Sequence, residues 1–151
     1  MTDIDENLAY EQANGSAVQD HLGYKLVEWA ENHAVVELEL KDFHRNRIGI
    51  LHGGILTTLM DTACGYAVCF CPVAGNVRKT MTLSLTTNFI GMAKDGVVRV
   101  VARKQGGGRK IVFTEATAYN ADGNVIGTST GTFKYHRGSD DPNGVLRDIK
   151  P

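Results

Sequence analysis

The 151-residue sequence lacks the patterns that mark disulfide-bonded, metal-binding and nucleic-acid-binding proteins. Its cysteines, Cys64, Cys69 and Cys71, are odd in number and form no C-x-x-C pair, so we expect buried free thiols. The five histidines are not spaced as metal ligands, and we predict no metal site. Sixteen Lys and Arg against 17 Asp and Glu give a net charge of -1, which argues against nucleic acid as a partner.

We also expect neither a leader segment nor a membrane-spanning run in this sequence. Residues 1–6 are acidic and have no basic or apolar leader character. Residues 55–71 are strongly apolar, but Asp61 and Gly65 interrupt them, and the stretch is too short to span a membrane. We therefore expect a cytoplasmic protein without a membrane partner. The length and the 42% hydrophobic content suit a single domain with a sizeable core.

One stretch, residues 46–71, carries most of the information in the chain. Its second half has apolar residues at three- and four-residue steps: Leu56, Met60, Ala63, Ala67 and Phe70. The positions between them are mostly small or uncharged, which predicts a helix buried almost all round. Apart from His52, the only acidic or basic residue between Arg47 and Arg78 is Asp61. A carboxylate in such a helix is costly unless it is paired, hydrogen-bonded or used in chemistry.

The predicted helix begins at His52-Gly53-Gly54. The first N–H groups of a helix have no internal partner and attract anions or polarised carbonyls, and glycines there allow a ligand to approach closely. Asp61 follows Gly53 by eight residues, a rise of about 12 Å along the helix. If both groups act on one carbonyl, two helices must meet, most simply across the twofold axis of a dimer.

The rest of the chain reads as strands joined by short turns. We predict a short N-terminal helix over about 5–20, weakened by Gly15, and a loosely docked or mobile tail after Gly138. The predicted strands cover residues 24–30, 34–41, 82–89, 97–103, 109–120 and 125–136. One antiparallel sheet that curls around the helix would bury both.

The motif Asn46-x5-His52-Gly53-Gly54-x6-Asp61 resembles the signature of the hotdog-fold acyl-CoA thioesterases, in the phenylacetate-pathway and thioesterase-superfamily-member-2-like branch. The resemblance covers about residues 20–136. It implies an α+β hotdog fold, in which a six-stranded antiparallel sheet wraps around one long central helix. The domain would then cover 23–137, with an N-terminal extension at 1–22 and a tail at 138–151.

The resemblance also implies roles for individual residues. Asp61 would be the general base or the nucleophile of thioester hydrolysis, and the Gly53 N–H would bind the oxyanion. Asn46 and His52 match positions that hold the carbonyl and the loop, and Ser84 matches the position that orients the attacking water. Each residue also has a non-catalytic explanation. The Asp61 carboxylate can be buried with its hydrogen bonds made inside the protein, Gly53 can begin the helix without binding a ligand, and His52 can serve only to support the loop.

The resemblance also implies a second site, which binds the coenzyme A part of the substrate. We expect no separate cofactor. Glycines joined to two cations can hold phosphates, although a flexible hairpin would have the same composition. The residues expected to bind the substrate or coenzyme A are Gly54, Thr82, Leu83, Gly107, Gly108, Arg109 and Lys110.

Two functions remain open from the sequence. The first is an acyl-CoA thioesterase acting on a small or medium acyl group, aliphatic or aromatic, as a homodimer or a homotetramer built as a dimer of dimers. The second is a non-catalytic module that binds acyl-CoA or an acyl carrier. Tyr66, Phe70 and Met81 would line an aromatic pocket or belong to the core.

Overall fold

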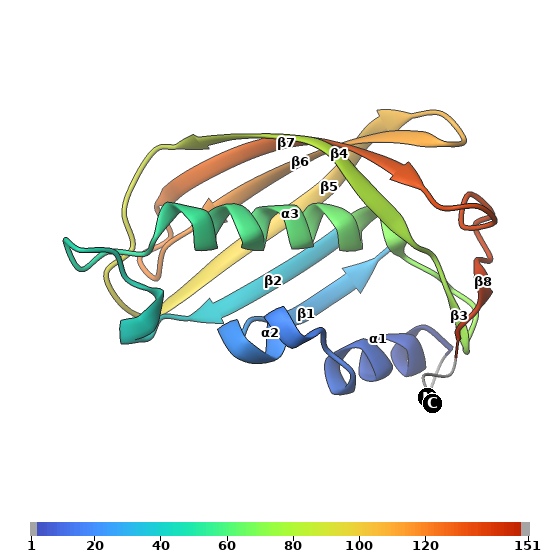
Figure 1. The fold of residues 1–151 in the computed structure, drawn as a ribbon, viewed down its shortest axis with the longest axis horizontal. Coiled ribbons are helices and arrows are strands. Elements are labelled where there is room, and N and C mark those ends of the chain that lie inside the picture. Colours follow the sequence, from blue (N-terminus) through green and yellow to red (C-terminus); the bar gives the residue numbers. More distant parts are fainter. Residues whose placement is uncertain (1–2, 149–151) are drawn as a thin grey trace.

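The computed structural model describes residues 3–148, and a six-stranded antiparallel sheet curled around one helix dominates it (Figure 1). The helix is α3 (Gly53–Cys69). The strands of the sheet are β1 (Lys25–Ala30), β2 (His33–Glu39), β4 (Thr80–Phe89), β5 (Val97–Gly107), β6 (Ile111–Tyr119) and β7 (Val125–Tyr135). Their order is β1-β2-β5-β6-β7-β4, which leaves β1 and β4 at the two edges. The fold class, the central helix and the six strands predicted for the sheet are confirmed.

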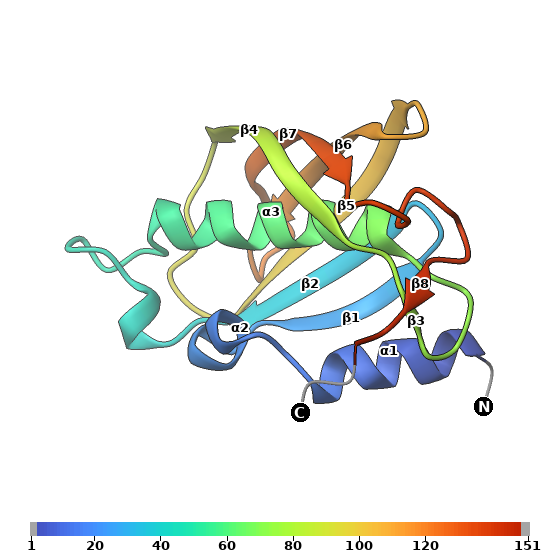
Figure 2. The ribbon, with the colours of Figure 1, turned by 45° about the vertical axis from the view of Figure 1, so that its right-hand side comes forward.

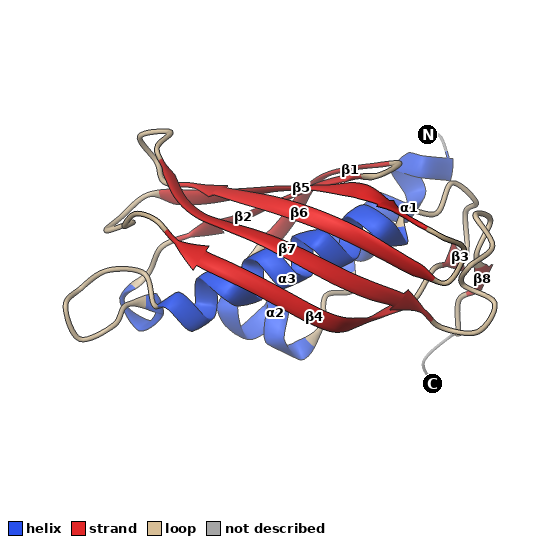
Figure 3. Cartoon of the chain, turned by 90° about the horizontal axis from the view of Figure 1, so that it is seen from above, coloured by secondary structure: helices blue, strands red, loops and turns tan. Residues whose placement is uncertain are grey.

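The core lies between α3 and the face of the sheet that curls around it (Figure 3). Buried and exposed side chains alternate along the central strands, as their sequences predict. The buried ones, mostly small or β-branched, point toward the helix. The buried residues of β5 and β6 include Val98, Val100, Ala102, Val112, Ala116 and Ala118. They pack with α3 residues Leu56, Leu59, Met60, Ala63, Ala67 and Val68.

Helix α3 is not buried all round, which corrects the expectation from its composition. Thr57, Asp61, Thr62 and Gly65 are only half-buried in the described chain. One curled sheet covers one side of a helix, and the side that carries these residues is left partly open. A surface of mostly small side chains with a single carboxylate suits contact with a further element or a ligand.

The N-terminal extension forms two helices rather than the single one predicted. Helix α1 (Asp3–Ala13) ends before Gly15, and α2 (Ala17–Leu22) begins after it. Ser16 caps α2, because its side chain accepts a hydrogen bond from the backbone N–H of Gln19. The start of the extension, residues 1–2, lies outside the described residues.

The C-terminal tail is docked as far as the structure describes it, which decides between the loosely docked and the mobile tail expected from the sequence. Strand β8 (Val145–Leu146) pairs with β3 (Asn76–Val77), a two-stranded sheet that the sequence did not predict. Arg147 then stacks on the Tyr10 ring at 3.5 Å and donates a hydrogen bond to Asn7 of α1. Figure 2 shows α1 close to β3 and β8 at one end of the molecule. The last residues of the expected tail, 149–151, lie outside the described residues.

The strand predicted to end at residue 103 runs further than its glycines suggested. Strand β5 instead continues to Gly107, with a bulge between Lys104 and Gly106. Gly107 has a φ of 126°, and a Cβ there would lie 2.5 Å from the carbonyl oxygen of Ile111, so only glycine fits.

No described helix is long and apolar enough to cross a bilayer.

Candidate functional site

Asp61 lies on the half-open side of α3 and faces strand β4. Its Oδ1 accepts a hydrogen bond of 2.8 Å from the hydroxyl of Thr82. Asp61 is half-buried and Thr82 is exposed, so water can reach the pair. The arrangement joins a carboxylate to a hydroxyl that can position a water molecule beside it.

Ser84, the residue expected to orient water, does not face Asp61. A bulge between Thr82 and Ser84 changes the register of β4 against β7. Thr82 lies opposite the buried Phe133, on the helix side of the sheet, whereas Ser84 lies opposite Thr132 and lines a shallow hollow with the exposed Phe113 on the outer side. In a regular strand the two residues would share a face, and the bulge separates them.

The start of α3 has the arrangement that its sequence predicts. His52 caps the helix, and its Nδ1 accepts a 3.0 Å hydrogen bond from the Gly54 N–H. The Gly53 N–H takes part in none of the hydrogen bonds found within residues 3–148. A Cβ on Gly53 would lie 3.1 Å from the Phe89 ring. Of the two glycines, Gly53 therefore has the free donor, and Gly54, expected to bind substrate, donates to His52.

Asn46 shapes the loop that leads into α3. Its Oδ1 accepts hydrogen bonds from the N–H groups of Ile48 and Ile50, at 3.1 and 3.3 Å. The fully buried His44, which the sequence did not single out, anchors the same loop. Its Nδ1 accepts from the Lys41 N–H, so its Nε2–H donates to the Leu22 carbonyl at 2.8 Å. Both residues fix the backbone just before Gly53.

The turn after β5 lies at the opposite end of α3 from Gly53 (Figure 1). The Gly108 N–H closes the turn on the Ile111 carbonyl, and Lys110 is exposed. Arg109 is exposed and pairs with Asp140, whose Oδ2 lies 2.5 Å from its Nε. This arginine lowers the pKa of the Asp140 carboxyl. Leu83, also expected to bind substrate, is 51% exposed on the edge strand β4.

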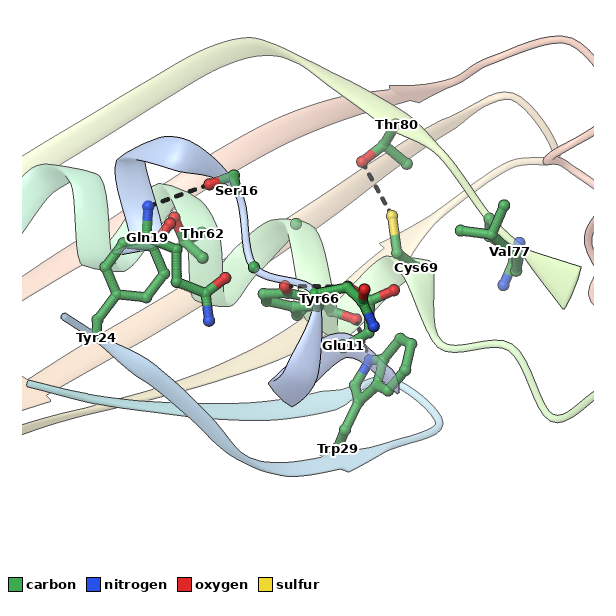
Figure 4. Close-up of a pocket in the computed structure, with 14 residues that line it drawn as sticks. Glu11, Ser16, Gln19, Tyr24, Trp29, Thr62, Tyr66, Cys69, Val77 and Thr80 are labelled. Atoms are coloured by element: carbon green, nitrogen blue, oxygen red, sulfur yellow. Dashed lines mark hydrogen bonds between the residues drawn. The ribbon is translucent and has the colours of Figure 1, made fainter. Parts of the chain in front are cut away.

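A cavity of about 400 Å³ is lined by Thr62 of α3 and Thr80 of β4, which lie close in the chain to Asp61 and Thr82 (Figure 4). Its walls come from α3, β4, Trp29 and the N-terminal helices, and they include Glu11, Gln19, Thr62, Tyr66, Cys69 and Thr80. Of the residues considered for an aromatic pocket, Tyr66 lines this cavity. Phe70 is buried edge-on against Trp29, and Met81 is exposed on β4. Sequence reasoning missed Glu11, because the fold brings it to α3 from a distant segment.

The three cysteines are free, as expected, and two of them are poor nucleophiles. Burial raises the pKa of Cys64 and of Cys69 to about 11. Both thiols are therefore protonated near neutral pH, and a thiolate is the nucleophilic form. Neither thiol therefore competes with Asp61 as the reactive group in our reading of the site.

Comparison with known proteins identifies the family. Residues 48–126 match the family model of the Thioesterase superfamily. A candidate esterase from Pseudomonas aeruginosa is 30% identical over 105 residues, which are 69% of this chain and 76% of that protein. A candidate esterase from Saccharolobus solfataricus is 32% identical over 89 residues, 59% of this chain, and the match spans only 57% of the relative's length.

Solved structures agree with this result. A conserved protein from Pseudomonas aeruginosa has a TM-score of 0.74 and 34% identity, with 85% of this chain and 99% of that chain covered. The PaaI protein from the phenylacetic acid degradation operon of E. coli has a TM-score of 0.76 at 21% identity, over 86% of this chain and 91% of that one, and shares the fold. The family model spans more than half of the chain and includes α3 with Asp61. The chain therefore belongs to the thioesterase superfamily and has the hotdog fold that its central motif predicts.

Proposed function

We propose that this protein is an acyl-CoA thioesterase that hydrolyses a small or medium acyl-CoA to the free acid and coenzyme A. Membership of the thioesterase superfamily supports hydrolase activity. The observation that carries the proposal is the water-accessible Asp61–Thr82 hydrogen bond, close to a cavity of about 400 Å³ that Thr62 and Thr80 line. A cavity of this size suits a small organic group.

The Asp61 carboxylate starts the reaction in either of two ways. As a general base it takes a proton from water while the resulting hydroxide attacks the thioester carbonyl carbon, and the C–S bond then breaks. As a nucleophile it attacks that carbon itself, releases the thiolate and forms an anhydride that water hydrolyses. In both routes the coenzyme A thiolate finally takes up a proton. Thr82 replaces Ser84 in our assignment, because its hydroxyl reaches the carboxylate.

The oxyanion donor in this proposal is the Gly53 N–H of a partner subunit. Gly53 and Asp61 of one chain are about 12 Å apart along α3, too far to act on one carbonyl. Strand β4 is an edge strand with exposed Met81 and Leu83, and edges of this kind favour pairing with a second strand. An antiparallel pair of α3 helices would bring Gly53 of one subunit to Asp61 of the other, making two equivalent sites.

Coenzyme A would extend from this shared site toward the turn after β5. Backbone N–H groups near Gly107 and Gly108 and the charges of Arg109 and Lys110 suit phosphate groups. Arg109 would exchange its ion pair with Asp140 for a phosphate.

With sites shared between two subunits, the active unit in this proposal is a homodimer. Sedimentation of the purified protein distinguishes a homodimer from a dimer of dimers.

Release of the coenzyme A thiol from a panel of aliphatic and aromatic acyl-CoA thioesters tests the function. We expect turnover by the wild type and a loss of several orders of magnitude in Asp61→Asn, with binding retained. Binding of these thioesters without turnover by the wild type would replace the hydrolase with an acyl-CoA-binding module.

A further inference from the structure

One wall of the cavity carries an acidic side chain from outside the central motif. Glu11 of α1 is half-buried, and its Oε2 accepts a 3.3 Å hydrogen bond from the Tyr66 hydroxyl (Figure 4). Among the hydrogen bonds of residues 3–148, none uses the other oxygen, Oε1. The carboxyl group therefore has an acceptor position available to a molecule in the cavity.

Asp61 and Thr82 do not line the cavity themselves, but the cavity reaches from residues close to them in the chain to Glu11. Thr62 and Gly65, one and four residues after Asp61 on α3, line it. Thr80 lines it from β4, on the same side of the strand as Thr82. From Asp61 to Cys69, α3 rises about 12 Å. An acyl group whose carbonyl lies at Asp61 would therefore point its other end toward α1.

The volume and the walls limit what this end can be. A cavity of about 150 Å³ already holds benzene, so 400 Å³ accommodates an acyl group of several carbons. Trp29 and Tyr66 supply apolar surface along the way, whereas Glu11, Gln19 and Thr62 make the walls polar. A purely apolar end would displace water from the Glu11 carboxyl without replacing its hydrogen bonds, which is unfavourable.

We infer that Glu11 is a specificity-determining residue, selecting acyl groups that end in a hydrogen-bond donor such as a distal hydroxyl. The inference rests on the proposed thioesterase function and assigns the class of its acyl group. The free Oε1 accepts the hydrogen bond from the donor. An acyl group of equal length with an apolar end leaves Oε1 desolvated, and one with a carboxylate end is repelled by the like charge.

Matched substrate pairs test this inference. The ω-hydroxyacyl-CoA thioesters of four to eight carbons are each compared with the unsubstituted acyl-CoA of equal length. We expect wild-type kcat/KM to favour the hydroxylated partner by about tenfold or more at the best length, because sites that hydrogen-bond a hydroxyl discriminate against analogues lacking it. In Glu11→Leu the preference should disappear or reverse.

Control variants show whether the effect belongs to the cavity. Glu31→Leu removes an exposed carboxylate in the β1–β2 turn and should leave the preference unchanged. Glu11→Gln keeps the side-chain shape and one acceptor oxygen, and it should retain part of the preference for the hydroxylated substrate. This variant replaces Glu11→Leu in the test if Glu11→Leu does not fold. Equal kcat/KM within every pair for the wild type, or a preference that survives in Glu11→Leu, would overturn the inference.

A binding measurement separates this inference from the proposed function. Hydrolysis-resistant thioether analogues of the same pairs are titrated into the wild type and Glu11→Leu by calorimetry. If no thioester is hydrolysed, the proposed function fails, while tighter binding of the hydroxylated analogue by the wild type alone would still support the role of Glu11. Equal binding of both analogues by the wild type would contradict it.

Discussion

At the scale of single residues, the proposed chemistry depends on which side chain of β4 reaches Asp61. We predict that Thr82→Val lowers kcat about 10- to 100-fold with a smaller change in KM, because the isosteric variant loses the hydroxyl that positions water at the carboxylate. Ser84→Ala is the matched control, since Ser84 lies on the other face of the sheet. Steady-state kinetics with one thioester measures both. A larger loss in Ser84→Ala than in Thr82→Val would reverse our assignment.

The titration of Glu11 gives a second prediction at this scale. Burial raises the pKa of Glu11, opposed by the hydrogen bond from Tyr66 and the charge of Arg147. The folded state therefore binds this proton more tightly than the unfolded state. The resulting stability is present below the unfolded pKa and is lost as the pH rises through the folded pKa.

Glu11→Gln removes this loss, because the amide does not ionise. Relative to the wild type, the variant should therefore gain stability between pH 4 and pH 7. Urea denaturation at the two pH values measures the difference in the free energy of unfolding. A relative loss of stability over the same interval would contradict the direction of the pKa shift.

The sequence indicates the arrangement of residues that depends on local geometry, but not the arrangement that depends on strand register or on distant contacts. His52 and Gly53 follow from the chemistry of a helix start, and both occupy it. The exchange of Ser84 for Thr82 depends on one bulge, which the alternation of residue types does not reveal. Glu11 reaches α3 only because the N-terminal helices fold back on the sheet, and no local pattern indicates this contact.

At the scale of elements, the turn after β5 makes the proposal for coenzyme A testable. We predict that Arg109→Ala raises KM for acyl-CoA thioesters and hardly changes KM for short thioesters that lack the nucleotide. Phosphate contacts stabilise the ground state and the transition state equally, so kcat should stay near the wild-type value.

The ion pair with Asp140 supplies the matched variant. Asp140→Ala frees Arg109 and should lower KM for the same acyl-CoA thioesters. Initial-rate kinetics with both substrate types measures the two effects. If Arg109→Ala changes KM equally with and without the nucleotide, Arg109 does not contact the phosphates.

The long elements were predictable because their signals are local. The three- and four-residue spacing predicted α3, and alternation predicted the strands of the main sheet. The pair of β3 and β8 escaped prediction, because two-residue strands carry no periodicity and their partners are far apart in the chain. The break between α1 and α2 was signalled by Gly15, and a cap at Ser16 completes it.

At the scale of the whole molecule, the proposal of shared sites can be tested by mixing subunits. Asp61→Asn lacks the carboxylate, and Gly53→Leu blocks the helix start beside Phe89. Each variant alone should be nearly inactive. Equal amounts unfolded and refolded together should recover about a quarter of wild-type activity, because half of the dimers are mixed and each has one intact site of two.

Refolding of each variant alone is the control for this experiment, and tagged subunits confirm that mixed dimers form. No recovery in confirmed mixed dimers would place Gly53 and Asp61 of each site within one chain. The half-open side of α3 and the exposed β4 edge would then serve only to hold the subunits together.

The strand order also has a consequence for the synthesis of the chain. Within the described residues β4 pairs only with β7. Thr80 of β4 can pair only after its partner Tyr135 of β7, 55 positions later in the chain, has been synthesised. Ribosomes add about 5–20 residues per second, so the strand that carries Thr82 stays unpaired for several seconds. During this time the nascent chain exposes both α3 and a ten-residue strand with unsatisfied backbone groups. The period before β7 emerges is therefore when the growing polypeptide most needs a chaperone.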